Sequence, residues 1–428
     1  MKSRLNLFAL LWPVLATLIS VLTAVALTGS SAPSALLDPG AIVRWGLPVL
    51  RAVQDLATGT TVGALVFACF ALANGKSLTR VLNLVAASAA IWAVTGAAAL
   101  VFTYLSVTGS AFSGSNSFGT ELWLFISQVQ LGQYLALNLL AAILVSTLAL
   151  AVSRLSWVIG VTLVAFAGLV PPALSGHAAG TAGHSMAVNA LGLHLVGVSV
   201  WVGGLVALWV CRDAENSAVL TKRYSSLALG AFVLVAISGI SSASLRMKFP
   251  ADFATAYGSI VLAKIVILVL LGALGAYYRL RLIKRGNSIY RLVVAELFLM
   301  GAAMGLAAAL SRTAPPESAV IAKNPTPAEL LTGDPLPPEL TPLRWITAYK
   351  IDLIWLLVCA AGIAFYVWGV IRLNRRNDKW PIARTLSWIA GMLTLLYITN
   401  GAMNLYEPYL FSVHMIAHMM LTMGVPVL

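Results

Sequence analysis

The stretch MAVNALGLHLVGVSVWVGGLVALWV, residues 186–210, decides the fold class of this chain. It contains no aspartate, glutamate, lysine or arginine. About 20 such residues suffice for a helix to cross the hydrocarbon core of a bilayer. We therefore predict a transmembrane helix that carries His194 in its interior.

The same pattern recurs along the whole chain of 428 residues. Hydrophobic residues make up 60% of it and charged residues 10%, and the mean hydropathy is +0.91. Soluble globular domains have far more charge and less apolar content. The prediction is an all-α, polytopic transmembrane helix bundle of about twelve spans. The apolar runs cover residues 5–28, 56–74, 81–105, 131–152, 156–174, 186–210, 225–245, 257–279, 290–310, 352–371, 385–402 and 409–428.

The basic residues predict the orientation of these spans. With a cytoplasmic N-terminus, 18 of the 27 lysines and arginines fall in cytoplasmic segments and eight outside, and Lys264 lies within a span. Such a bias follows the positive-inside rule. Topology thus explains the net charge of +13 without a nucleic-acid partner.

The first apolar run has a second interpretation. Lys2 and Arg4 precede it, and Ala24-Val-Ala26 resembles a weak signal-peptidase site. A signal peptide has an apolar core of about 7–15 residues, which is shorter than this run. An uncleaved first span is the favoured prediction.

Prolines and acidic residues interrupt the spans between residues 312 and 349. Such a segment reads as an extracytoplasmic linker. It divides a nine-helix domain at residues 1–311 from three helices at residues 350–428. The last predicted helix ends about ten residues after His418, so we expect the C-terminal module to be truncated.

No enzyme motif is evident. Cys69, Cys211 and Cys359 lie far apart and form no CxxC pair, so neither disulfides nor a thiolate site is indicated. There is no nucleophile elbow, phosphate loop or Ser/His/Asp set. We expect a transporter or assembly factor and no catalytic residues.

Two histidines four residues apart are the strongest chemical signal. His414 and His418 share one helix face, so both imidazoles can bind one metal ion. Met415 and Met419 follow them directly, and imidazole with thioether suits copper, Cu(I) in particular. Glu407, placed by Pro408 at the mouth of the same predicted helix, is expected on the histidine face. Met423 continues the methionine spacing on an adjoining face.

The other three histidines lie on or near the outer half of the predicted topology. His177 and His184 occupy a glycine-rich loop with Met186 just beyond, which suits metal capture; a polar turn is the alternative. His194 lies near the bilayer midplane, where an ionisable residue is a functional candidate by default. Trp201, seven residues on, shares its face. Ala190, Gly197 and Gly204 form a neighbouring small-residue stripe that permits close helix contact.

Two more charges lie inside predicted spans. Lys264 and Glu296 differ in depth by roughly 10 Å, so a direct ion pair is not expected. Lys264 either extends outward or lines a path, and Glu296 either pairs with cytoplasmic arginines or lines the same path.

Short motifs between about residues 155 and 316 resemble the copper resistance protein D (CopD) family. Residues 341–428 resemble the start of the CtaG family of cytochrome c oxidase assembly factors, although Ala417 stands where that family often has glutamine. The order of the two resembles bacterial bifunctional CopD/CtaG fusions. The CopD-like motifs are His194 to Leu205, Arg223-Tyr-Ser225, Ser238-Gly239, Tyr257-Gly258, Lys264, Glu296 and Pro315-Pro316, and the CtaG-like motifs are Trp380-Pro381, Arg384, Gly391 and Phe411-Ser-x-His414-Met-x-x-His418-Met419.

The resemblance implies copper transport across the bacterial cytoplasmic (plasma) membrane, copper supply for oxidase assembly, or both. The implied partners are membrane lipid and either haem-copper oxidase subunits or an extracytoplasmic copper chaperone. Two alternatives stay open. One is a haem b-binding electron carrier, with His194 and a later histidine as axial ligands; the other is a scaffold whose histidines only pack.

Overall fold

The computed structural model describes residues 2–33, 38–112, 116–175, 184–282, 290–316 and 326–428, without the side chains of 2–10, 116, 184, 281–282 and 290–291. All regular structure in these ranges is helical, which confirms the all-α prediction. Among the described residues, eleven helices are long and apolar enough to cross a membrane, and a shorter apolar helical segment covers Phe411–Val427. The predicted number of about twelve spans agrees with this.

The chain divides into two compact units, and each is described on its own. The first comprises Met1–Gly176 and Leu191–Ser318, and the second comprises His177–Ala190 and Ala319–Leu428. The helices of the first unit are α1 (Lys2–Thr28), α2 (Ala41–Ala71), α3 (Lys76–Thr108), α4 (Asn116–Gln128), α5 (Gln130–Ala151), α6 (Leu155–Ala167), α7 (Val170–Leu174), most of α8 (His184–Val210), α9 (Ser217–Ser244), η1 (Ala251–Ala254), α10 (Ala256–Tyr277), η2 (Tyr278–Leu282) and α12 (Tyr290–Leu310).

Helix α2 begins 15 residues earlier than predicted. The apolar run predicts a start at residue 56, with Arg44 and Arg51 in the extracytoplasmic segment before it. The helix instead begins directly after Gly40, whose φ of 91° suits glycine, and runs to Ala71. Arg51 and Asp55 are therefore helical residues.

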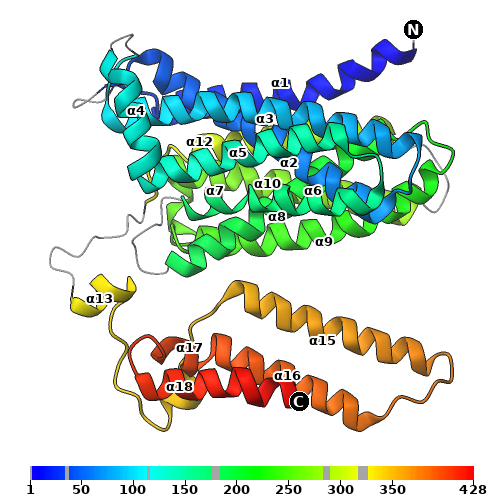
Figure 1. The fold of residues 1–428 in the computed structure, drawn as a ribbon, viewed down its shortest axis with the longest axis vertical. Helices are drawn as coiled ribbons and strands as arrows, with labels where there is room; N and C mark the ends of the chain where they lie inside the picture. Colours follow the sequence, from blue (N-terminus) through cyan, green and yellow to red (C-terminus); the bar gives the residue numbers. More distant parts are fainter. Residues whose placement is uncertain (1, 34–37, 113–115, 176–183, 283–289, 317–325) are drawn as a thin grey trace. The chain divides into compact units, whose positions relative to one another are not determined.

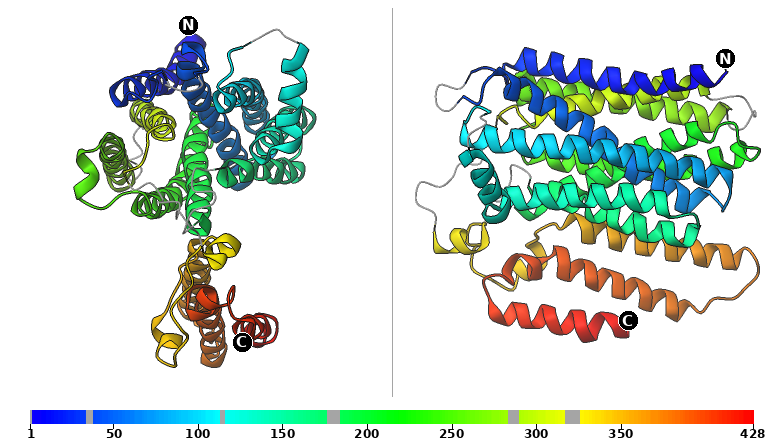
Figure 2. Two further views of the ribbon diagram at one scale, coloured as in Figure 1. Left: turned by 90° about the vertical axis from the view of Figure 1, so that its left-hand side faces the viewer. Right: turned by 45° about the horizontal axis from the view of Figure 1, so that its top comes forward.

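The sequence analysis missed α4. This helix runs crosswise to the long helices at one end of the first unit, so it is seen from the side where they are seen end-on (Figures 1 and 2). Trp123 and Leu124 are more than half exposed on it. An aromatic, apolar face of this kind is typical of a helix that lies in the membrane interface.

Glycines bring α2 and α8 into backbone contact. A Cβ added to Gly63 would lie 1.9 Å from the carbonyl oxygen of Ser199, and one added to Gly203 would lie 2.3 Å from that of Gly59. No larger residue fits this crossing without moving a helix backbone. The contact fixes the depth of α8 against α2.

A buried amide on α5 makes hydrogen bonds to two other helices and to one turn of the first unit. Asn138 on α5 accepts hydrogen bonds from Gln54 Nε2 (2.9 Å) and Trp92 Nε1 (3.0 Å), and its own Nδ2 donates to the carbonyl oxygen of Gly168 (2.7 Å). Both the side-chain oxygen and the side-chain nitrogen of Asn138 are thus hydrogen-bonded. Its bonds hold α2, α3 and the α6–α7 turn at one depth.

The second unit is built on the antiparallel pair α15 (Leu353–Asn374) and α16 (Ile382–Asn400), which lie side by side in Figures 1 and 2. Tyr366 and Trp388 stack between them, with ring centroids 5.1 Å apart. Asp352 caps α15 by accepting from the backbone N–H groups of Ile354 and Trp355. The unit also contains α13 (Pro327–Thr332), α14 (Arg344–Thr347), α17 (Ala402–Tyr406), α18 (Phe411–Met419), η3 (Met420–Gly424) and α19 (Val425–Val427).

Candidate functional site

His194 lies ten residues into α8, about 15 Å along the helix axis, and is half-buried. Its Nδ1 lies 3.1 Å from Ser238 Oγ of α9. That hydroxyl already donates its hydrogen to the carbonyl oxygen of Leu234 (2.6 Å), so it can only accept from the imidazole. Nδ1 therefore carries the proton, and the lone pair of Nε2 is available to a metal ion.

A glycine of α9 and a charged residue of α10 lie near the ring of His194. A Cβ added to Gly239 would lie 3.7 Å from His194 Cε1, an ordinary contact. Lys264 of α10 is close enough for its charge to act on His194, and Arg246 acts in turn on Lys264. Lys264 forms no ion pair with any residue that the structure describes. No ion pair joins Lys264 to Glu296 among these residues, and the sequence analysis expected none.

Trp201 is anchored at both its side chain and its backbone. The indole Nε1 donates to Glu296 Oε1 of α12 (3.3 Å), and the hydroxyl of Tyr224 on α9 donates to the carbonyl oxygen of Trp201 (2.8 Å). Phe232 lies edge-on to the indole, with centroids 5.6 Å apart and planes at 89°. Pairing with cytoplasmic arginines, one of the two alternatives for Glu296, is not seen in the described ranges, where its hydrogen-bond donor is the indole of Trp201.

The small-residue stripe on α8 permits the close contact that the sequence predicted. A Cβ added to Gly197 would meet Val235 at 2.9 Å, and one added to Gly204 would meet the ring of Tyr224 at 2.8 Å. Both neighbours belong to α9. Gly203, beside this stripe, makes the α2 contact, which the sequence analysis missed.

His414 and His418 lie one turn apart on α18, and both side chains are exposed in the second unit. Val413 and Ala417 form the buried face of the same helix. The two imidazoles therefore do not pack in the core of this unit. Met415 and Met419 are also exposed, at 39% and 46%.

Glu407 does not share this helix, which corrects the prediction. It follows the end of α17, and the chain turns through residues 407–410, where the backbone N–H groups of Tyr409 and Leu410 both donate to the carbonyl oxygen of Tyr406. Pro408 therefore precedes α18 and does not occupy its first turn, so Glu407 has no fixed angular relation to the histidines. Beyond Met419 the helix widens into the π-turn η3, which takes Met423 out of the regular methionine spacing.

The three predicted loop ligands are His177, His184 and Met186. His177 and the side chain of His184 lie outside the described residues, and Met186 is half-buried on the first turn of α8. Among described residues, no three His, Cys, Asp or Glu side chains gather into a metal site. His194 belongs to the first unit, and His414 and His418 belong to the second.

Three charged residues that the sequence analysis left in loops form a cluster in the first unit. Arg51 donates to Thr103 Oγ1, and Arg312, just beyond α12, donates to Ser106 Oγ, each at 3.3 Å. The charges of Arg312 and Asp55 both act on Arg51. Burial lowers the pKa of the Arg312 guanidinium. The signal that could have found the cluster is the Gly40–Gly75 interval, which is long enough to place Arg51 and Asp55 in a helix.

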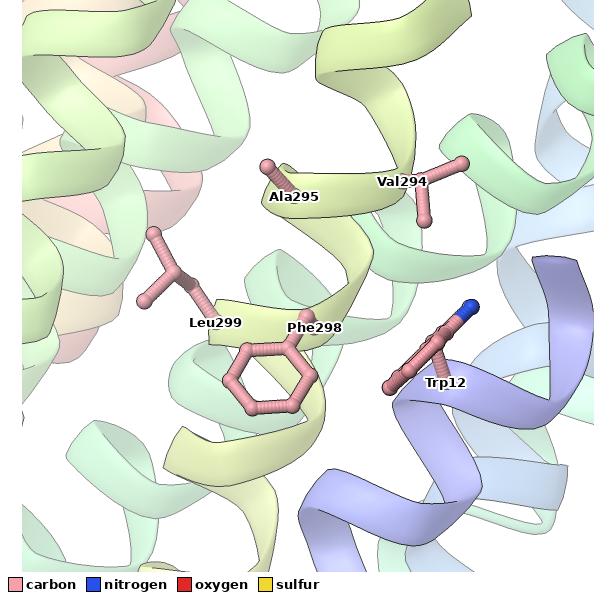
Figure 3. A pocket seen from close by; sticks show the side chains of 5 residues that line it. All are labelled: Trp12, Val294, Ala295, Phe298 and Leu299. Carbon is pink, nitrogen blue, oxygen red and sulfur yellow. The ribbon is translucent and has the colours of Figure 1, made fainter.

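The apolar pocket between α1 and α12 is no metal site. Trp12 of α1 and Val294, Ala295, Phe298 and Leu299 of α12 line it, and Trp12 projects toward Val294 and Phe298 (Figure 3). A metal ion needs lone-pair donors, and these side chains supply none.

Three family models match the chain in sequence order. The copper resistance protein D-like N-terminal domain matches residues 37–188, copper resistance protein D matches residues 218–310, and the cytochrome c oxidase caa3 assembly factor (CtaG) matches residues 364–428. One chain therefore carries CopD and CtaG segments. The predicted resemblance to a CopD/CtaG fusion is confirmed. The chain is a multi-pass protein of the plasma membrane.

Curated relatives match parts of the chain. An uncharacterized protein of Mycobacterium leprae is 36% identical over 95 residues, which are 22% of this chain and 14% of that protein. Copper transport protein CutJ of Bacillus subtilis is 32% identical over 165 residues, which are 36% of this chain and 30% of that protein. The chain thus spans less than a third of the length of these relatives. No solved structure matches it.

The candidate residues fall in different matched segments of the chain. Ser238, Lys264 and Glu296 lie in the CopD segment, and His414 and His418 lie in the CtaG segment. His194 and Trp201 lie between the two matched CopD regions. The hydrogen bonds from His194 to Ser238 and from Trp201 to Glu296 join them to the CopD segment.

Proposed function

We propose that this protein handles copper in the plasma membrane, by transporting the ion across the bilayer and supplying it for cytochrome c oxidase assembly. The observation that carries the proposal is the His194 imidazole, held inside a span with Nδ1 bonded to Ser238. This tautomer leaves the lone pair of Nε2 to bind an ion. The CopD and CtaG segments and the likeness to CutJ support copper as that ion.

His194 acts as a ligand on the path within the bundle. Neutral imidazole binds copper, and a hydrogen bond to its second nitrogen fixes the ring and raises its basicity. Cu(I) is the favoured state, because it accepts two or three soft or borderline ligands and needs no redox step. His177, His184 and Met186 are proposed to capture the ion before it reaches His194.

His414 and His418 hold the ion for delivery. Their imidazoles are exposed on one face of α18, and the thioethers of Met415 and Met419 are exposed beside them. Two nitrogen donors on an accessible surface allow a third ligand to come from another protein. A haem-copper oxidase subunit or an extracytoplasmic copper chaperone is the proposed partner.

The proposed transport and delivery roles correspond to the two proposed domains. Residues 1–311 form the CopD-like transport domain, residues 312–349 an extracytoplasmic linker and residues 350–428 the CtaG-like assembly domain. Trp201, Lys264 and Glu296 line the path through the first of these.

Copper co-purification tests the proposal. The detergent-purified wild-type chain is compared with His414→Ala/His418→Ala and with His194→Ala, and Ile416→Ala is the matched control because it removes an exposed side chain without a donor atom from the same helix. We expect copper to fall in both histidine variants and to stay at the wild-type level in the control. Unchanged copper in the double variant overturns the α18 assignment. A Soret band in the wild-type spectrum favours the haem alternative.

A further inference from the structure

The carboxyl group of Glu296 is buried among aromatic rings in the first unit. It lies six residues into α12 and is 5% exposed. Its hydrogen-bond donor is Trp201 Nε1, at 3.3 Å from Oε1. Tyr224 and Tyr278 lie near enough for Glu296 to act on both hydroxyls.

The basic residues of the elements around Glu296 form no ion pair that the structure describes with it. Residues 11–28 of α1 and 56–71 of α2 carry no charged side chain, and Lys264 is the single charged residue of α10. Arg223 of α9 and Arg279 of η2 donate to the carbonyl oxygens of Ala71 and Ser225. The groups facing Glu296 are Trp201 from α8, Tyr224 from α9 and Tyr278 from η2. In the described part of the chain, no lysine, arginine or histidine forms an ion pair with Glu296.

Protonation of Glu296 avoids a buried carboxylate that has neither an ion pair nor enough hydrogen-bond donors. A buried carboxylate with one indole donor is strongly disfavoured, whereas a neutral carboxylic acid accepts from the indole and keeps an O–H group to donate. The hydroxyl of Tyr278, which is 7% exposed, has no hydrogen-bond partner among the described residues, so it offers an acceptor in this region.

The helix α8 connects this carboxyl to His194. Trp201, which binds Glu296, follows His194 by seven residues on the same face, about 10 Å along the axis. A positive charge at His194 therefore acts on Glu296 through a poorly screened interior and favours its ionised form.

We propose that Glu296 holds a proton in the copper-free protein and releases it when a copper ion occupies the His194 position. The carboxyl O–H bond breaks, the carboxylate keeps the electron pair, and the proton leaves to water, so the charge of the arriving Cu(I) ion is balanced. The inference rests on the proposed copper function and adds proton coupling to it.

Infrared spectroscopy of the copper-free protein tests whether Glu296 is protonated. We expect a carbonyl band of a protonated carboxyl at neutral pH, sensitive to H/D exchange, that Glu296→Gln abolishes. Glu121→Gln, which removes an exposed carboxylate bonded by Tyr104, keeps the band. Trp201→Phe retains Glu296 and shifts the band, because the indole donor is lost. A wild-type spectrum without the band overturns the proposal.

Proton release on Cu(I) addition tests the second half. We expect about one proton fewer per bound copper from Glu296→Gln than from the wild type, with copper content measured in the same samples. Equal release at equal copper content overturns the coupling. Failure of the wild type to bind copper instead overturns the proposed function, and the infrared band still decides whether Glu296 is protonated.

Discussion

Replacing Gly63 by alanine should destabilise the protein more than a glycine-to-alanine substitution at any other position of the α2–α8 crossing. The new Cβ would lie 1.9 Å from the carbonyl oxygen of Ser199 and 2.7 Å from the Cα of Gly203. Both are backbone atoms of a packed helix, so no side-chain rotation relieves the contact. The helices must separate by about 1.5 Å to restore an ordinary distance of 3.4 Å.

The cost follows from overpacking. Added methyl groups in well-packed interiors cost about 1–3 kcal/mol, and a backbone-limited site lies at the upper end of this range. Gly59→Ala is the matched control, one turn away on α2, because its Cβ meets its nearest neighbours at 3.7 Å. That substitution should be neutral, or stabilising by about 0.5–1 kcal/mol through helix propensity.

Equilibrium unfolding of the detergent-purified proteins measures both effects, with helical circular dichroism as the signal. We expect Gly63→Ala to lower the unfolding free energy by about 3 kcal/mol relative to wild type. Its copper affinity should also fall, since a displaced α8 changes the His194–Ser238 geometry. A Gly63→Ala protein as stable as Gly59→Ala would refute the crossing described above.

Three further substitutions test individual contacts. Ser238→Ala removes the acceptor for His194 Nδ1 and should lower Cu(I) affinity about 10–100-fold in a competition titration, whereas Ser241→Ala on the same helix should leave it unchanged. Asn138→Leu leaves three buried polar groups without partners and should cost at least about 3 kcal/mol of unfolding free energy; a wild-type melting temperature would contradict this. Asp352→Ala removes the α15 cap and should cost about 1 kcal/mol, with Asp352→Asn retaining most of the stability in the same melting assay.

The spans were predictable because hydropathy and length act on each helix separately. Boundaries were harder where polar residues continue a helix, as Arg51 and Asp55 do on α2. Helix α4 was missed because 13 residues are too few for a span. Glu407 was misplaced because a regular helix was extrapolated through Pro408, where the backbone instead makes a turn.

The sequence supplied the candidate residues of the site and not their partners. Residue type and spacing alone identify a histidine inside an apolar run and two histidines at i and i+4. Their partners are not identified in this way, since Ser238 and Glu296 reach α8 from helices that begin tens of residues later. The α2–α8 crossing likewise depends on Gly63 and Gly203, which are 140 residues apart. Only packing shows that these small residues face each other.

The most direct test of the account is X-ray absorption at the copper edge of the Cu(I)-loaded chain. We predict nitrogen ligation with the outer-shell scattering of imidazole rings, reduced in His414→Ala/His418→Ala and reduced again when His194→Ala is added. Copper bound only through sulfur or oxygen, with the same spectrum in all variants, would contradict the claim that these histidines handle the ion.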